Sequence, residues 1–255
     1  MSNLAQEFWS ARIKGSVLDR ALIESIESLD SAYKIQEETM ALSGMKRVGW
    51  KVGATSESAQ KMIGTSQPAA GALLEPYCYE SPASIEISRM QTSYVESEFA
   101  FCFAKSLPPR DKEYDREDIV AAIESVIPAI EVVATRFEGG FAELGELRLV
   151  ADNVANVAWV KGAEFTNWKH FDFLRNSISL SRGGGILATG SGAEVLGGPI
   201  NVLAWTANHL SRMGVGLSQG EVISTGTCTG VVEIGPGDTI VADFNRLGSV
   251  TVSFE

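Results

Sequence analysis

Acidic side chains in two apolar segments are the residues of this sequence best suited to chemistry. Glu96 and Glu98 lie two residues apart in the run 94–104, and on a β-strand such residues share one face at a spacing of about 7 Å. Glu131 is the one carboxylate within residues 128–134, where an unpaired charge would be costly. If the two strands are neighbours, the three carboxylates converge, and their repulsion then requires a proton or a cation between them.

Few other side chains in the sequence could bind a metal or act in catalysis. The chain has two histidines and three cysteines, without the ligand spacing of a zinc site. We expect His170 and His209 to be packing or surface residues. Three carboxylates would suit a hard, oxygen-preferring cation such as Mg²⁺ or Mn²⁺. Two other interpretations remain open, because alternating glutamates also mark a solvated strand face and Glu131 could pair with Arg136 or Lys51.

The segments that must position these glutamates alternate between helical and strand-like patterns. Toward the N-terminus, apolar spacing predicts helices over residues 4–15, 18–29, 30–44 and 56–63 and a strand over residues 46–52. Beyond residue 90 we expect helices over residues 115–126 and 199–213, and strands over residues 92–104, 129–137, 154–160, 178–180, 185–189, 222–225, 239–244 and 249–254. Many short strands with few helices favour an α+β chain with a folded-over sheet. We expect a boundary near residue 80, between an N-terminal α/β subdomain (1–80) and a β-rich domain (81–255).

Composition and charge restrict the class of protein. A chain of 255 residues that is 45% hydrophobic and 21% charged is typical of a globular protein. The net charge of −11 argues against a nucleic-acid partner, and no apolar run reaches the roughly 18–20 residues that span a bilayer. The first residues lack a secretory signal pattern, and the odd number of cysteines indicates reduced thiols. We therefore expect a cytoplasmic protein.

An ordered set of short motifs resembles a known family. The motifs are Gly49-Trp50-Lys51-Val52-Gly53-Ala54-Thr55-Ser56, Glu96-Ser97-Glu98, Pro128-Ala129-Ile130-Glu131, Asp152-Asn153, Val195-Leu196-Gly197-Gly198-Pro199 and Ser224-Thr225-Gly226-Thr227-Cys228-Thr229-Gly230. Together they resemble the 2-keto-4-pentenoate hydratase / 4-oxalocrotonate decarboxylase group of the fumarylacetoacetate hydrolase superfamily. The resemblance runs from about residue 45 to the end of the chain.

This resemblance implies a fold and a metal site. The fold is a fumarylacetoacetase-like mixed β-roll with a smaller helical and α/β N-terminal portion, so residues 81–255 would form the catalytic domain. The implied metal is Mg²⁺ or Mn²⁺, held by Glu96, Glu98 and Glu131. Family members usually assemble as dimers or larger homo-oligomers, and their substrates are small 2-oxo acids that chelate the metal.

The resemblance also assigns roles around the metal. Lys51 and Glu98 would be the catalytic residues, since the lysine resembles the family's substrate-contacting lysine, whose charge can bind a carboxylate or move a proton. Thr227 and Gly226 resemble the loop that binds the substrate carboxylate, and a glycine lets backbone N–H groups approach an anion closely. Asn153 would be a further polar contact to substrate.

The implied activity is a metal-dependent hydro-lyase acting on a short unsaturated 2-oxo acid of the 2-hydroxypenta-2,4-dienoate type, in the catabolism of aromatic compounds. Alternatives within the family are a 2-oxo-enedioate decarboxylase and an acylpyruvate-type C–C hydrolase. An alternative of another class is an inactive binding or support subunit, because this chain lacks polar residues common in the family's hydratases. It has alanines within residues 67–71 and at Ala134, where an aspartate is common, and Gly198 where a histidine often precedes the matching proline.

Overall fold

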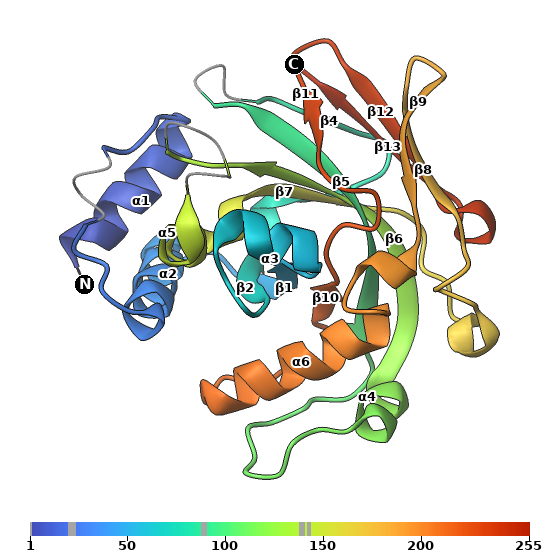
Figure 1. The fold of residues 1–255 in the computed structure, drawn as a ribbon, viewed down its shortest axis with the longest axis horizontal. Helices are drawn as coiled ribbons and strands as arrows, with labels where there is room; N and C mark the ends of the chain where they lie inside the picture. Colours follow the sequence, from blue (N-terminus) through green and yellow to red (C-terminus); the bar gives the residue numbers. More distant parts are fainter. Residues whose placement is uncertain (1, 20–23, 88–90, 138–140, 142–143) are drawn as a thin grey trace.

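The computed structural model describes residues 2–19, 24–87, 91–137, 141 and 144–255 (Figure 1). The chain forms two mixed β-sheets with helices at their margins, as expected for the α+β class. The α-helices are α1 (Asn3–Lys14), α2 (Leu29–Ser43), α3 (Glu57–Ile63), α4 (Arg116–Ala122), α5 (Gly145–Ala151) and α6 (Pro199–Arg212). Across these described residues, no helix is long and apolar enough to cross a membrane.

Local capping explains where several of these helices begin and end. Ser28 caps α2 by accepting the N–H of Ser31, while Ser31 caps it reciprocally, and Gly44 ends the helix in the left-handed conformation. Asp115 forms the same reciprocal arrangement with Asp118 at the start of α4. Backbone N–H groups at a helix start have no intrahelical partner, so these side chains define the boundaries.

The larger sheet has eight strands and holds the acidic segments. Its order is β2-β1-β10-β5-β6-β7-β3, with β11 also paired to β5. The strands are β1 (Arg47–Gly53), β2 (Ala69–Leu74), β3 (Cys78–Glu80), β5 (Ser93–Phe103), β6 (Ile123–Ala134), β7 (Asn156–Lys161), β10 (Val222–Ser224) and β11 (Val232–Ile234). Strands from before and after residue 80 hydrogen-bond to one another, so the sheet crosses the boundary expected there.

The second sheet packs against the first through an aromatic core. Its order is β4-β13-β12-β8-β9, made of β4 (Ala83–Ile85), β8 (Ile178–Arg182), β9 (Gly185–Gly190), β12 (Thr239–Asp243) and β13 (Ser249–Phe254). The buried Phe99 of β5 packs edge-on against Phe173 and Phe244. Because Phe99, Phe101 and Phe103 point into this core, the alternate residues of β5 face the opposite side.

The helices lie on two sides of the sheets. In Figure 1, α1, α2 and α5 group beside one margin, while α4 and α6 lie together below the larger sheet. The helix expected over residues 18–29 is wrong for the described residues 18–19 and 24–28, which are not helical. Leu18 instead forms a bridge to Phe137, with its N–H donating to the carbonyl of Arg136 at 2.7 Å. Residues four apart also share a face of an extended chain, because side chains there alternate with a period of two. The apolar spacing alone therefore does not distinguish a helix from an extended segment.

Candidate active site

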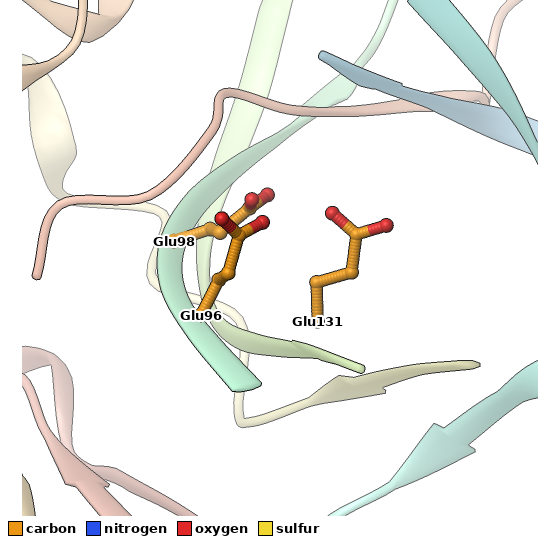
Figure 2. A group of neighbouring side chains, drawn as sticks. All are labelled: Glu96, Glu98 and Glu131. Atoms are coloured by element: carbon orange, nitrogen blue, oxygen red, sulfur yellow. The ribbon is translucent and has the colours of Figure 1, made fainter. Parts of the chain in front are cut away.

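Neighbouring strands bring the three glutamates together. In the antiparallel β5–β6 pair, Glu96 lies directly opposite Glu131, and Glu98 lies opposite Ala129. Directly opposed side chains on one face have Cβ atoms about 5 Å apart. Figure 2 shows the three carboxyl groups gathered on the same side of the sheet, and one oxygen of each lies within 4.8 Å of the others. The predicted convergence of Glu96, Glu98 and Glu131 is therefore present in the structure.

This cluster has the properties of a cation site. Glu98 and Glu131 are fully buried, and Glu96 is partly buried. The Oε1 atom of Glu98 is inaccessible and has no hydrogen-bond partner within the described residues. A buried carboxylate oxygen without a donor is costly unless a proton or a cation satisfies it. Three oxygen ligands of this kind fit a hard divalent cation.

Burial and mutual repulsion change the acidity of the cluster. Burial raises the pKa of Glu96 to about 7, although the charge of Lys51 opposes the shift. Burial, and then the charges of Glu131 and Glu96, raise the pKa of Glu98 well above its usual range. Both shifts mean that, without a cation, burial favours the protonated form of these two carboxyl groups.

Lys51 is the cation that the protein itself supplies. It is 2% exposed, and its Nζ lies 3.1 Å from Oε2 of Glu131 and donates to the carbonyl of Val154 at 2.9 Å. Burial lowers the pKa of Lys51, but the carboxylates of Glu131, Glu96 and Glu98 outweigh it and the net shift is upward. The pairing of Glu131 with Lys51, one of the simpler interpretations of the sequence, is thus real, and it coexists with the three-carboxylate cluster.

An unusual turn places the carbonyl that holds Lys51. Asn153, Val154 and Ala155 all have left-handed backbone conformations, with φ of 51°, 52° and 57°. Such a φ is rare for a β-branched residue such as Val154. The turn directs the Val154 carbonyl at the Lys51 ammonium, and no pattern in the sequence predicts this.

Two further polar residues orient the glutamates. Ser224 of β10 donates its hydroxyl to Oε2 of Glu98 and accepts from Nε1 of Trp159 at 3.0 Å. Asn156 of β7 donates its amide to Oε1 of Glu131 at 2.9 Å. These residues were not predicted from the sequence, although each is a polar side chain inside or beside an apolar strand, the signal that identified Glu131.

Two arginines hold Asn156 in turn. Arg12 of α1 donates to the Asn156 carbonyl at 2.6 Å, and Arg136 donates to the same oxygen at 2.8 Å. Arg136 is itself ion-paired with Asp152 in a buried contact. Arg136 therefore pairs with Asp152 and hydrogen-bonds Asn156. The interpretation that pairs Arg136 with Glu131 is wrong.

A small cavity opens onto Lys51 and Glu96. Its volume is about 180 Å³, below the roughly 300–1,000 Å³ of pockets for drug-sized ligands. Its walls include residues of β1, α3, β5, β6, α5 and the segment after β10. The described lining residues are Lys51, Gly53, Ala54, Thr55, Ser56, Ser58, Ala59, Met62, Ile63, Glu96, Val133, Phe141, Leu149, Val154, Thr227, Gly230 and Val231.

The predicted substrate contacts divide into two groups. Thr227 lines the cavity, and its hydroxyl donates to the Gly230 carbonyl at 2.8 Å. Gly226 has φ of +90°, and a Cβ there would lie 2.2 Å from Oγ1 of Thr55, so only glycine fits. Asn153 does not line the cavity, because its side-chain amide bonds both the N–H and the carbonyl of Ala72, at 2.7 and 2.9 Å.

Residues 80–255 match the sequence model of the fumarylacetoacetate hydrolase C-terminal family. This match covers more than half of the chain, including all three glutamates and Thr227. The chain belongs to the fumarylacetoacetate hydrolase family. The N-terminal residues that supply Lys51 and α3 lie outside the matched range.

The curated relatives of this chain include enzymes named as a hydratase and a decarboxylase. A 2-keto-4-pentenoate hydratase of Paraburkholderia xenovorans is 31% identical over 231 residues, which cover 89% of this chain and 84% of the relative. A 4-oxalocrotonate decarboxylase of Pseudomonas putida is 30% identical over 226 residues, covering 88% of this chain and 84% of the relative. Both alignments extend well beyond the matched C-terminal domain.

A solved structure shares the whole fold. A 4-oxalocrotonate decarboxylase from Pseudomonas putida, complexed with magnesium and adipate, superposes with a TM-score of 0.89 at 27% identity. The alignment covers 99% of this chain and 96% of that one. This likeness confirms the expected fumarylacetoacetase-like α+β fold.

Proposed function

We propose that this protein is a metal-dependent hydro-lyase that adds water to a short 2-hydroxy-2,4-dienoate, in the catabolism of aromatic compounds. The observation that carries the proposal is the convergence of three carboxylates, two of them fully buried, beside the buried Lys51, with Lys51 and Glu96 lining a small cavity. Relatives named 2-keto-4-pentenoate hydratase support it, as does the metal bound to the similar decarboxylase structure.

Glu96, Glu98 and Glu131 would hold the cation, with Mg²⁺ or Mn²⁺ as the expected ion. A bound divalent cation supplies Lewis acidity, which favours the enol form of a 2-oxo acid. The residues around the glutamates keep them in place. Ser224 orients Glu98 and Asn156 orients Glu131, so the ligand oxygens are positioned before the ion arrives.

Lys51 is the proposed group for binding substrate and moving protons. Its ammonium lies at the cavity wall, held between Glu131 and the Val154 carbonyl. A fixed positive charge there attracts the substrate carboxylate and can hydrogen-bond the enol oxygen. Glu98, the other residue with an expected catalytic role, would act through the cation that it helps to hold. Thr227, which also lines the cavity, would bind the substrate carboxylate together with the Gly226 loop.

Decarboxylation of a 2-oxo-enedioate is the second candidate, because the structure with a TM-score of 0.89 is a decarboxylase. The same enol would form, and loss of CO₂ would replace addition of water. An acylpyruvate-type C–C hydrolase shares the same first step but has no comparable support. An inactive support subunit is disfavoured by the complete set of three glutamates and Lys51. We also propose that the protein is a homo-oligomer, as the family resemblance implies.

Product analysis tests the proposal. The purified chain with Mg²⁺ should convert 2-hydroxypenta-2,4-dienoate to a 4-hydroxy-2-oxo acid, detected by loss of the dienol absorbance and by mass spectrometry. Glu98→Gln should lose this turnover, whereas Glu124→Gln, an exposed change on the same strand as Glu131, should keep it. Release of CO₂ from an enedioate without hydration of the dienoate would instead support the decarboxylase.

A further inference from the structure

The charge of the cavity is confined to one end. Among its described lining residues, the only charged side chains are Lys51 and Glu96, which both belong to the glutamate cluster. No other lysine, arginine or histidine lines it within the described residues. The remaining walls carry small, hydroxyl or apolar side chains. A substrate whose oxo-acid end meets Lys51 and the glutamates must therefore extend its tail between uncharged walls.

Helix α3 forms much of the wall around that tail. Ala59, Met62 and Ile63 of α3 line the cavity, and Phe141 and Val231 line it as well. Met62 is 54% exposed and Val231 is 48% exposed, so both lie at the rim. Ligand-binding cavities are lined predominantly by apolar side chains of this kind. They offer a surface on which a hydrocarbon tail can pack.

Among the described lining residues, a second carboxylate on the tail would find no free cationic partner. Moving a carboxylate from water to an apolar wall is costly unless a cation receives it. Lys51 cannot do so at the same time, since it lies beside the glutamates, where the proposed function uses its charge to bind the oxo-acid end. Lys61 of α3 is exposed and does not line the cavity.

We propose that the cavity selects 2-oxo acids with a single carboxylate and a short uncharged tail, and that Met62 is a specificity-determining residue at the tail end. This inference rests on the proposed function and narrows it, since it favours substituted 2-hydroxy-2,4-dienoates over enedioates. Each methylene added to the tail should tighten binding about four-fold until the cavity is filled. A terminal carboxylate should weaken binding at least ten-fold.

Two unreactive acids of equal chain length test this by binding alone. 2-Oxohexanoate and 2-oxohexanedioate differ only in the terminal group, and calorimetry on the Mg²⁺-loaded wild-type protein gives both affinities. We expect 2-oxohexanoate to bind at least ten-fold more tightly. Equal affinities, or a preference for the diacid, would overturn the inference and leave the proposed function standing. If neither acid binds, the protein has no 2-oxo acid site, and both this inference and the proposed function are refuted.

Two lysine variants then locate the tail. Met62→Lys places a cation at the rim and should reduce the preference for 2-oxohexanoate at least ten-fold. Met213→Lys makes the same substitution at another exposed methionine, 38% exposed at the end of α6, and should leave the preference unchanged. Both sites are exposed, so the variants should fold, and circular dichroism checks this. An unchanged preference in Met62→Lys would show that the tail does not reach α3.

Discussion

Binding of Mg²⁺ should stabilise the folded protein, and the size of the effect follows from the glutamate cluster. Three carboxylates with oxygens within 4.8 Å of one another repel in the metal-free protein, and a dication relieves that repulsion. At a free Mg²⁺ concentration of 100 times Kd, mass action adds about 2.7 kcal/mol to the free energy of unfolding. For a chain of this size, about 1 kcal/mol changes Tm by roughly 2–4 °C, so we expect an increase of roughly 5–11 °C.

Glu98→Gln should abolish this increase while leaving the metal-free protein nearly as stable as the wild type. Burial raises the pKa of Glu98 well above its usual range, so the metal-free site favours the neutral acid there. Glutamine is neutral, has the same shape, and can still accept the Ser224 hydroxyl bond. The substitution therefore removes a metal ligand at little structural cost. Glu124→Gln is the matched control, because Glu124 is exposed on the same strand as Glu131.

Differential scanning fluorimetry with increasing Mg²⁺ or Mn²⁺ measures these changes. The increase should be larger at pH 8 than at pH 6, because the pKa of Glu96 is about 7 and protons compete with the metal below that pH. If neither cation raises the wild-type Tm, or if Glu98→Gln responds as the wild type does, the metal-site reasoning is refuted.

Three further predictions concern residues around the site and in the core. Asn156→Ala should weaken Mg²⁺ binding about 10–100-fold in calorimetry, because Glu131 loses the amide that orients it; unchanged affinity would contradict that role. Lys51→Met should lower kcat at least 100-fold in the dienoate assay, while Mg²⁺ still raises Tm; near-normal turnover would exclude Lys51 from catalysis. His209 packs between Tyr33 and Trp205, and burial lowers its pKa from 6.5 to about 4. Its contribution to stability is therefore complete above pH 6.5 and is lost as the pH falls toward 4. Between pH 7 and pH 5 the wild type should lose about 2 kcal/mol more than His209→Phe in urea unfolding; equal losses would argue against a depressed pKa.

The alternation of residue types along β5 determined which face of the strand carries the glutamates. Alternation in β5 predicts that Phe99, Phe101 and Phe103 share one side and that Glu96 and Glu98 share the other, and both statements hold in the structure. Side chains along a strand alternate between its two faces, so the order of apolar and polar residues shows which face is buried. The lone carboxylate in an apolar run, Glu131, was recognisable for the same reason.

Only the tertiary structure decided how the site is completed. Lys51 of β1 meets Glu131 of β6, eighty residues further along the chain, although β10 and β5 lie between these two strands in the sheet, and the left-handed turn at Val154 supplies the carbonyl that Lys51 contacts. Asn153, whose motif suggested substrate binding, instead bonds the backbone of Ala72. Strand order and turn conformation depend on packing between segments far apart in the chain, which local patterns do not encode. The residue types therefore indicated the chemistry, while the fold decided which of them reach the cavity.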